Sequence, residues 1–388
     1  MTATSEARSS TAAATIVLVT PGFRPLTGGV EAHTCALTTE FVKYGLKVDV
    51  LTARRGVRRA RVDEYQGHRV VTYPAWSVRS MSISPRLVWG AFKRRRGAAL
   101  LHVHSYHATT ALAVLGARTP TVFTPHYHGR HGHSAVANIL HVAFYPLARL
   151  LLARCDAVIT VSDAERRQLL HDFPCATDRV VVIPNGIELS AIRTATPLHD
   201  QPPTVLCVGR LEPYKRFADV ITAFAQVPPP AQLVIVGDGS QRAKLLALGT
   251  DLGIAGRVKL VGGVSNRDLH RWFRTAKVLV SYSEREAFGM VALEAAAGGA
   301  RIVLSDIAAH REIAAQYLGD CGLVVPHRCP SGLAAAIRQQ LRAPRTEPAA
   351  IYDWPEIAAR TVAVYRSVAG DLIAEPQCKA LENERIHR

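Results

Sequence analysis

Short apolar runs rich in β-branched residues alternate with longer amphipathic segments along the first half of the chain. We expect helices over 29–45, 86–96, 107–117, 135–153 and 163–172. The runs between them are expected strands: TIVLVT (15–20), KVDVLT (47–52), HRVVTYP (68–74), ALLHVH (99–104), TVFTPH (121–126), DAVITVS (156–162) and RVVVIPNG (179–186). This alternation predicts a parallel sheet with helices on both faces.

The same alternation restarts after a polar stretch that contains prolines, at 188–203. Expected helices cover 216–226, 240–253, 266–275, 289–299, 309–316 and 331–342. The expected strands are TVLCVGRL (204–211), QLVIVGDG (232–239), RVKLVGGV (257–264), KVLVSYS (277–283), ARIVLSD (300–306) and GLVVP (322–326). A last helix is expected from Asp353, with Glu356 placed to complete a capping box.

These patterns predict two Rossmann-like doubly wound domains, an organisation that suits a chain of 388 residues. Because such sheets bind ligands at the carboxyl ends of their strands, we expect the two domains to face each other across a deep cleft. The expected segments are a disordered N-terminus (1–14), an N-terminal domain (15–190), a linker (191–203), a C-terminal domain (204–352), a helix that packs back on the first domain (353–373) and a tail (374–388).

Composition narrows the class to an α/β enzyme, with 48% hydrophobic and 20% charged residues. The seven cysteines have no paired spacing, so neither a disulfide framework nor a zinc ribbon is expected. Residues 1–14 have no signal-peptide pattern, and no apolar run is long enough to span a membrane. The expected location is the cytoplasm, with peripheral contact at the inner face of the membrane left open.

Positive charge is concentrated in the first half of the chain. The formal net charge is +16, and from Arg54 to Arg154 sixteen Lys and Arg residues face only Asp63 and Glu64, which leaves +14 on this stretch. Such a region attracts phosphates, anionic lipid or nucleic acid. A merely solubilising basic face is an equal alternative for any single charge.

A glycine-containing loop follows the first expected strand, in LVTPGFRPLTGGVEAH. Gly28 and Gly29 let a ligand approach the backbone where a helix starts, and free amides there can bind an anion. The pattern is not G-x-G-x-x-G, so a dinucleotide site is not supported. An ordinary strand-to-helix turn is the alternative.

Two cations, Arg210 and Lys215, lie in VGRLEPYKR after the first strand of the second half. A planar guanidinium and a compact ammonium together suit a diphosphate. A solvated pair of loop residues is the alternative, although the place at the end of a strand favours a ligand site.

Two carboxylates, Glu286 and Glu294, lie in EREAFGMVALE with seven residues between them. The first falls in a loop and the second on the helix that follows, so both are expected to face the crevice and to bind hydroxyl groups of a sugar and a ribose. Each acid taken alone could instead be a helix cap or a salt-bridge partner. Between them the start of the helix offers an anion site through the amides of Phe288, Gly289, Met290 and Val291.

Taken together, these motifs resemble the retaining GT-B glycosyltransferases of family 4, the glycosyltransferase group 1 family, over nearly the whole chain. The resemblance is carried by GGVE, FTPHYHG, VSDAERRQLL, VVIPNGIE, VGRLEPYKR, IVGDG, LVGGVSNRDLHRW and EREAFGMVALE. It implies transfer of a hexose from a nucleoside diphosphate donor, with a UDP-sugar favoured over GDP-mannose. The domain 15–190 would then be the acceptor side, and the domain 204–352 would bind the nucleotide sugar.

The resemblance also implies roles for individual residues. Gly29 would approach a phosphate, Arg210 and Lys215 would neutralise the departing diphosphate, and Glu286 would hold sugar hydroxyls. Further positions carried over from the family are Glu294 at the ribose, His126 near the anomeric centre and the 6-hydroxyl, and the backbone of Gly263 and Val264 at the base.

Fixed cations and amide dipoles at the phosphate fit this reaction, because negative charge builds on the leaving group. The chain contains no D-x-D, the usual carboxylate pair for a nucleotide-bound metal, so no metal and no other cofactor are expected. Retention by front-side attack is what the family implies.

Histidines gather in HYHGRHGH, which contributes His126, His128, His131 and His133, and in HVHSYH, which adds three more. The spacing is compatible with zinc or nickel. Because no Cys or carboxylate lies in the stretch and the family pattern uses His126, we expect no metal here, and the loop is expected to line the acceptor side.

The acceptor is expected to carry a hydroxyl and to be anionic, lipid-linked, or a small polyol or natural product. The basic stretch 54–154 is the expected place of any contact with an anionic membrane. Alternatives are a nucleotide-sugar epimerase or a phosphorylase of the same fold, and a nucleic-acid-binding protein, which lacks a reading motif here.

Overall fold

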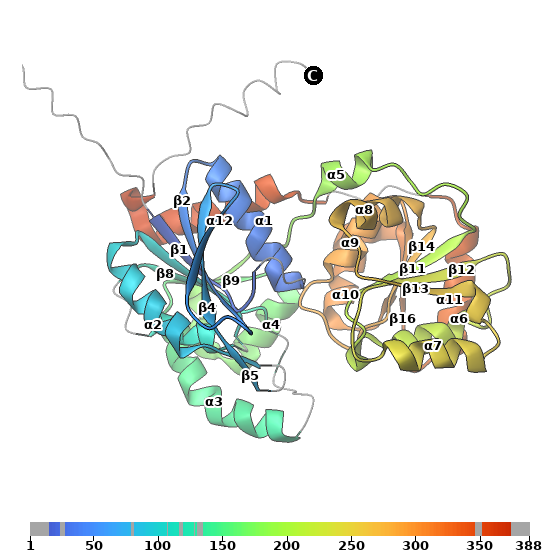
Figure 1. Ribbon diagram of the computed structural model, residues 1–388, viewed down its shortest axis with the longest axis horizontal. Helices are drawn as coiled ribbons and strands as arrows, with labels where there is room; N and C mark the ends of the chain where they lie inside the picture. Colours follow the sequence, from blue (N-terminus) through green and yellow to red (C-terminus); the bar gives the residue numbers. More distant parts are fainter. Residues whose placement is uncertain are drawn as a thin grey trace, which may run out of the picture. The chain divides into compact units, whose positions relative to one another are not determined.

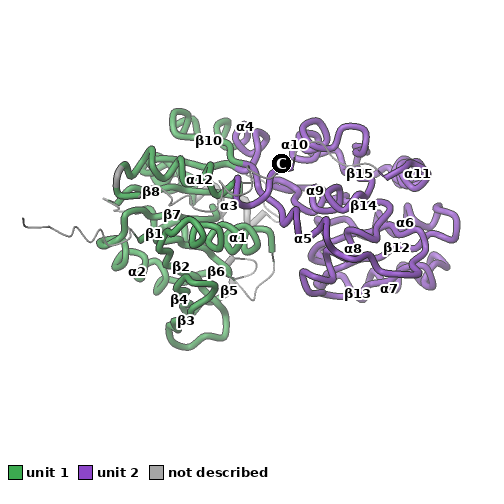
Figure 2. The backbone as a smooth tube through the Cα atoms, turned by 90° about the horizontal axis from the view of Figure 1, so that it is seen from above, with its two compact units in different colours: residues 1–160, 169–183, 357–388 green, residues 161–168, 184–356 purple. Residues whose placement is uncertain are grey.

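The computed structural model describes residues 15–23, 28–78, 81–106, 108–115, 119–127, 129, 135–345 and 351–373. It divides into two compact units, drawn in different colours in Figure 2. Unit 1 comprises residues 1–160, 169–183 and 357–388, and unit 2 comprises residues 161–168 and 184–356.

Unit 1 is built on an eight-stranded sheet in the order β10-β9-β8-β7-β1-β2-β4-β3, parallel except for the β3–β4 pair. Its elements are β1 (Thr15–Val19), α1 (Gly29–Lys43), β2 (Lys47–Arg54), β3 (Arg61–Tyr65), β4 (His68–Pro74), β5 (Trp76–Val78), β6 (Met81–Ile83), α2 (Pro85–Arg94), β7 (Leu100–His104), β8 (Thr121–Thr124), α3 (Ala135–Arg154), β9 (Ala157–Thr160) and β10 (Val180–Val182), with 3₁₀ turns η1 (Arg95–Gly97), η2 (Thr109–Val114) and η3 (Pro174–Arg179).

Both faces of this sheet are apolar, as expected for a doubly wound sheet. On β1, Val17 and Val19 join the core beneath α2, η2 and α3, while the intervening Ile16 and Leu18 are also fully buried. Helices α1 and α12 (Trp354–Ala369) lie side by side (Figure 1), with the ring centroids of Phe41 and Tyr365 5.3 Å apart.

Unit 2 is built on a six-stranded parallel sheet in the order β13-β12-β11-β14-β15-β16. Its elements are α5 (Leu189–Thr194), β11 (Thr204–Val208), η4 (Pro213–Lys215), α6 (Phe217–Phe224), β12 (Gln232–Val236), α7 (Arg242–Asp251), η5 (Ala255–Arg257), β13 (Val258–Gly262), α8 (Asn266–Thr275), β14 (Val278–Ser281), α9 (Met290–Ala297), β15 (Arg301–Ser305), α10 (Ala308–Ile313), a π-helical turn η6 (Ala314–Leu318), η7 (Gly319–Cys321), β16 (Gly322–Val325) and α11 (Pro330–Arg342). Helix α4 (Asp163–Asp172) includes residues of both units.

Alternate residues of β11 serve the two faces of this sheet. Val205 and Cys207 pack with α6, α7 and α11, whereas Leu206 packs with α5, α8 and α9. In Figure 1 these two groups of helices lie on opposite sides of the sheet. Because successive side chains point to opposite faces, β11 is buried on both sides of the sheet. This burial fixes the position of its carboxyl end.

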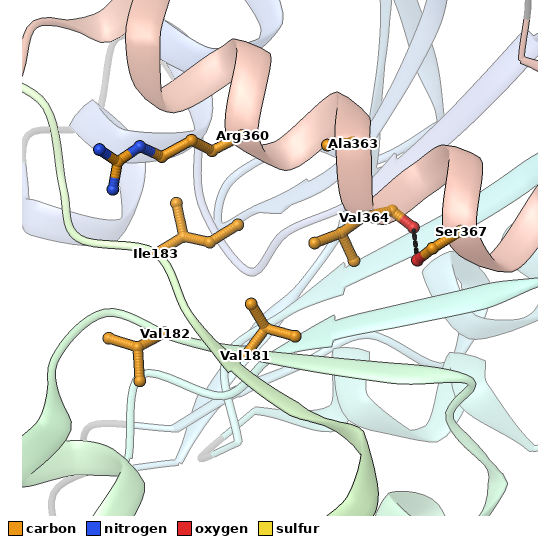
Figure 3. A pocket seen from close by; sticks show the side chains of 7 residues that line it. All are labelled: Val181, Val182, Ile183, Arg360, Ala363, Val364 and Ser367. Carbon is orange, nitrogen blue, oxygen red and sulfur yellow. Dashed lines mark hydrogen bonds between the residues drawn. The ribbon is translucent and has the colours of Figure 1, made fainter.

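Helix α12 returns to unit 1. It starts with the expected cap, because the Glu356 amide donates to Asp353 Oδ1 at 3.3 Å, and from Ile357 onward its residues belong to unit 1. Figure 3 shows a pocket of about 390 Å³ between α12 and the β10 segment. Val181, Val182, Ile183, Arg360, Ala363, Val364 and Ser367 line it, and none of them is a predicted site residue.

Three features were not expected. Strand β3 and the small β5–β6 hairpin fall in segments for which no strand was predicted, and the expected helix 107–117 is a short 3₁₀ helix over its described part. Among the described residues, no helix is both long and apolar enough to cross a membrane. All six cysteines within the described residues are free thiols.

Candidate functional site

The sheet of unit 2 reverses its winding order at β11. The chain leaves β11 through α6 to β12 on one side, while β14 pairs with β11 on the other. The loops after β11 and β14 therefore diverge at their carboxyl ends, and in open α/β sheets ligands bind in the crevice formed there.

Lys215 and Glu286 meet at this switch point. Lys215 ends η4 in the loop after β11, Glu286 lies in the loop after β14, and the distance from Nζ to Oε1 is 2.5 Å. Their side chains are only 15% and 19% exposed. The structure thus brings together one cation and one anion that were predicted to bind the two parts of a single donor.

The Glu286 carboxyl stays ionised in this setting. Burial acts to raise its pKa, but the ammonium of Lys215, the charge interaction with His310 and hydrogen bonds from Lys215 and Ser283 outweigh burial, so the pKa lies below its ordinary value. An ionised carboxylate accepts hydrogen bonds only, which is the property needed to hold sugar hydroxyls.

Tyr214 ties the two loops together. Its carbonyl oxygen accepts a hydrogen bond from the Glu284 amide at 2.9 Å, and the Arg285 guanidinium lies 4.7 Å from its ring centroid. The exposed Arg210 donates to the Tyr214 hydroxyl at 3.2 Å. Arg210 is therefore connected to the loop of the Lys215–Glu286 pair through Tyr214, and its hydrogen bond goes to the tyrosine rather than to a carboxylate.

Helix α9 begins beside this pair. Its N-cap is Gly289, at φ 103°, and no side chain caps the helix. A Cβ at position 289 would come within 3.1 Å of Ile313. Any other residue there would also have to adopt a left-handed backbone conformation, which residues other than glycine rarely do. Phe288 is buried in the core, whereas Met290 and Val291 are partly exposed, so the amides of the first turn lie at the surface of the site.

His310 is a residue of this site that the sequence did not reveal. Its Nδ1 lies 2.9 Å from Ser305 Oγ, whose hydroxyl donates to the Ser283 carbonyl, so Nδ1 carries the proton. Its Nε2 is a buried acceptor without a hydrogen-bond partner among the described residues. Burial lowers the pKa of His310 to about 4, which keeps the ring neutral. This unpaired lone pair is suited to accept a ligand hydroxyl.

Glu294 differs from Glu286 in its electrostatics. It lies on α9 and is partly buried. Burial, and secondarily the charge of Glu188, raise its pKa to about 7. The two predicted carboxylates are therefore in opposite states near neutral pH, one firmly ionised and one at its midpoint.

The predicted base-binding backbone lies at the end of β13. The Gly263 amide donates to Asp238 Oδ2 at 2.7 Å, and Val264 packs on the core that contains α8 and α9. Gly237 is needed because its Cβ would lie 2.1 Å from the Gly209 carbonyl oxygen. The Gly263 amide is therefore already engaged by a carboxylate of the protein itself.

Unit 1 has its own switch point, between β1 and β7, because β1 continues through α1 to β2 on the other side. His126 lies just after β8, with a left-handed φ of 48° and an exposure of 7%. It lies against His104 at the end of β7, at 3.4 Å between Nε2 of His126 and Nδ1 of His104, and against His33 on α1, at 5.1 Å between ring centroids.

The glycines before α1 accommodate a carboxylate of the protein itself. A Cβ at Gly28, the N-cap, would come within 2.3 Å of Glu31 Oε2, whereas a Cβ at Gly29 would meet nothing within 4 Å. Glu31 therefore folds back over the start of α1, and a phosphate at Gly29 would share this helix end with its carboxylate. The remaining histidines of the HYHGRHGH stretch, His128, His131 and His133, lie outside the described residues.

Two doubly wound units, each with polar groups at the switch point of its sheet, define the GT-B class of glycosyltransferases. Solved structures agree: the chain superposes on sucrose-phosphate synthase from Thermosynechococcus elongatus with a TM-score of 0.70 and 21% identity, covering 91% of this chain and 98% of the other. Anabaena HepE in complex with UDP-glucose gives a TM-score of 0.67 and 20% identity, covering 92% and 98%. These likenesses show the fold.

Family models identify the chain itself. The model for glycosyltransferase family 4 matches residues 27–191, and that for glycosyl transferases group 1 matches residues 190–352. A phosphatidyl-myo-inositol mannosyltransferase from Mycolicibacterium smegmatis is 29% identical over 386 residues, which cover 92% of this chain and 94% of that protein. The protein therefore belongs to the group 1, family 4 glycosyltransferases and is a transferase enzyme.

Proposed function

We propose that this glycosyltransferase moves a hexose from a nucleoside diphosphate donor to a hydroxyl acceptor, with retention of configuration and without a metal cofactor. The observation that carries the proposal is the Lys215–Glu286 pair at the switch point of unit 2. A UDP-sugar is the first candidate donor, and GDP-mannose is the second.

Lys215, Arg210 and the uncapped start of α9 would stabilise the leaving diphosphate. Negative charge grows on the phosphate as the glycosidic bond breaks, and fixed cations and amide dipoles stabilise that charge without reorganising. The ammonium now paired with Glu286 would turn to the phosphate when the donor enters. No carboxylate pair for a nucleotide-bound metal is needed in this scheme.

Glu286 and the Nε2 of His310 would accept hydrogen bonds from hydroxyls of the transferred sugar, and Glu294 would hold the ribose. By analogy with the family, we propose that His126 lies near the anomeric centre, Gly28 and Gly29 at a phosphate, and Gly263 and Val264 at the base. Retention would follow from attack on the face that the diphosphate leaves, with a phosphate oxygen taking the proton of the acceptor hydroxyl.

Release of UDP, GDP or ADP from a panel of nucleotide sugars tests the proposal. We expect Lys215→Ala and Glu286→Ala each to reduce turnover about 100-fold or more, the scale of losing one preorganised electrostatic contact. Lys244→Ala and Glu284→Ala are matched controls, since both side chains are more exposed and lie outside the pair.

Near-normal turnover of both Lys215→Ala and Glu286→Ala, with their folding verified by circular dichroism, would overturn the site. A product that retains its nucleotide and lacks a new glycosidic bond would indicate a nucleotide-sugar epimerase instead. Full turnover in the presence of EDTA is expected, and its loss would contradict a metal-independent reaction.

We further propose that the acceptor is anionic or lipid-linked, with contact between the basic stretch 54–154 and an anionic membrane. The similarity to the mycolicibacterial phosphatidyl-myo-inositol mannosyltransferase supports a lipid acceptor. A small polyol or natural product is the alternative acceptor, and it would need no membrane.

We propose that this contact is made by a surface around α2, which we call the α2 surface. It consists of Trp89, Phe92, Lys93, Arg95, Arg96 and Leu115. Trp89 is 62% exposed, and the Lys93 ammonium lies 5.4 Å from its ring centroid. The helix and the 3₁₀ turn after it, residues 85–97, contain no acidic residue. An exposed indole among cations is typical of surfaces that bind anionic lipid headgroups.

Vesicle co-sedimentation tests this surface, with phosphatidylcholine alone and with added phosphatidylglycerol. Binding is expected only with the acidic lipid, and the double variant Lys93→Glu, Arg96→Glu should weaken it about tenfold or more, since each cation near the membrane contributes about 1 kcal/mol. The double variant Arg58→Glu, Arg59→Glu is the control, because it changes the net charge by the same amount outside the α2 surface. The role of the indole is tested by Trp89→Ala. Its control is Trp76→Ala, because both indoles are 62% exposed.

Equal pelleting with and without acidic lipid would remove the membrane contact. Equal loss in the variant and control pairs would remove the α2 surface but keep a contact that depends only on net charge.

A further inference from the structure

Three buried histidines converge in unit 1 from segments far apart in the sequence. His33 comes from the first half of α1, His104 from the end of β7, and His126 from the loop after β8. Their exposures are 3%, 0% and 7%. One ligand atom of each lies within 4.8 Å of those of the other two. We call this group the histidine triad.

The spacing of the triad matches a tetrahedral metal site. Two nitrogens bound to one tetrahedral Zn²⁺ are about 3.4 Å apart, and the centres of their rings about 5 Å apart, given Zn–N bonds of about 2.0–2.1 Å. Nδ1 of His104 and Nε2 of His126 are 3.4 Å apart. The three ring centroids are 5.1, 5.5 and 5.7 Å apart. The same distance is at the long end for a hydrogen bond between the two rings, and a bound metal would replace that hydrogen bond.

The chemical state of the triad also favours a metal. His104 is fully buried at the end of β7, so its ring is held among side chains rather than in water. Nε2 of His104 is buried without a hydrogen-bond partner among the described residues.

His102, which packs against the triad, is held in one orientation by hydrogen bonds. His102 packs against the His104 ring at 4.1 Å between centroids, and its nitrogens are engaged by the Tyr365 hydroxyl at 2.6 Å and Thr124 Oγ1 at 2.8 Å. A buried, held neighbour of this kind restricts how far the His104 ring can turn, which preserves a ligand set.

We propose that His33, His104 and His126 bind a divalent transition-metal ion of the Zn²⁺ type, with water as a fourth ligand. Three imidazoles without a carboxylate suit Zn²⁺, Co²⁺ or Ni²⁺ and do not suit Mg²⁺ or Ca²⁺, which require oxygen ligands. This site is distinct from a nucleotide-bound metal. The ion acts as an inhibitor, because it removes His126 from the sugar, and this role rests on the proposed function.

Zinc binding to the full-length, untagged protein tests the site directly. After treatment with a chelator, the protein is dialysed against ZnCl₂ and the bound metal is measured by mass spectrometry. We expect one Zn²⁺ per chain from the triad, and intense visible absorption when Co²⁺ replaces it, as for tetrahedral coordination. His33→Gln and His104→Gln should each weaken binding at least tenfold.

His68→Gln is the matched control, since His68 is a buried histidine of unit 1 outside the triad, with a pKa lowered by burial to about 4. Urea unfolding of each variant verifies that the fold is retained. Absence of bound zinc in the wild type, or unchanged binding in both His33→Gln and His104→Gln, would overturn the site.

Nucleotide release, measured in chelator, tests the proposed function separately from metal binding. Added Zn²⁺ should raise the donor KM of the wild type and leave that of His33→Gln unchanged. Stoichiometric zinc binding without any change in KM would overturn the inhibitory role.

Discussion

At the scale of single residues, the Glu294 carboxyl lowers the stability of the fold at neutral pH, and the same carboxyl is proposed to bind the donor ribose. Its carboxyl is partly buried near Glu188, and burial with the charge of Glu188 raises its pKa to about 7. The ordinary pKa of Glu is about 4.3, so the unfolded chain releases this proton well before the folded protein does. Native stability therefore decreases as the pH rises from about 4 to about 7, and the loss is complete above that range.

Glu294→Gln separates stability from ligand binding. The variant should be more stable than the wild type at pH 8 and show a smaller gain at pH 5, because the amide needs no deprotonation in a buried place. Its donor KM should rise about tenfold or more, since a hydrogen bond to a charged group contributes about 1.5–3 kcal/mol. Thermal unfolding at both pH values and donor kinetics check these two results.

Glu284→Gln is the control, because Glu284 is 50% exposed. A stability difference between Glu294→Gln and the wild type that is the same at pH 5 and pH 8 would contradict the raised pKa.

Single residues also show where prediction from sequence stops. Lys215 and Glu286 were predictable because each follows a strand, and carboxyl ends of neighbouring parallel strands meet at one edge. His310 comes 24 positions after Glu286 on α10, and His33 lies on α1 whereas its partners lie at the end of β7 and after β8, much further along the chain. Periodicity assigns these histidines only to elements, so their convergence appears only when the sheet is assembled.

At the scale of elements, the apolar runs predicted the parallel strands because these are buried on both faces. Strand β3, RVDEY, escaped because it is an exposed antiparallel edge strand, where charged residues are normal. The 107–117 segment is apolar enough for a helix, yet its described part forms 3₁₀ turns. Buried 3₁₀ turns and a buried α-helix both require apolar residues, so the apolar pattern could not distinguish the two structures.

Helix α12 is anchored by one buried hydrogen bond. The Tyr365 hydroxyl and Nδ1 of His102 are 2.6 Å apart, and both side chains are fully buried. Tyr365→Phe removes the hydroxyl and leaves this nitrogen unpaired away from water. We expect the free energy of unfolding to fall by about 1–3 kcal/mol, measured by urea denaturation.

Ala359→Gln, at an exposed position of the same helix, provides the comparison and should change the free energy of unfolding by less than about 0.5 kcal/mol. A wild-type value for Tyr365→Phe would contradict the anchoring role of the hydrogen bond.

At the scale of the whole molecule, the two units repeat one arrangement. Each has a parallel sheet that reverses its winding, at β1 and β7 in unit 1 and at β11 and β14 in unit 2, and each places polar side chains at that reversal. Buried histidines occupy the first and an ion pair occupies the second. The strand-helix alternation predicted the repeated architecture, but the different chemistry at the two reversals depends on side-chain contacts.

The return of α12 to unit 1 affects how the enzyme can be recombined with its relatives. The family matches end at residue 352, yet the segment from Ile357 covers a face of the first sheet and supplies Tyr365 to its core. An exchange of acceptor specificity between two such enzymes must therefore transplant the C-terminal helix together with the N-terminal half. A chimaera joined at a single crossover would combine one parent's sheet with the other parent's cover.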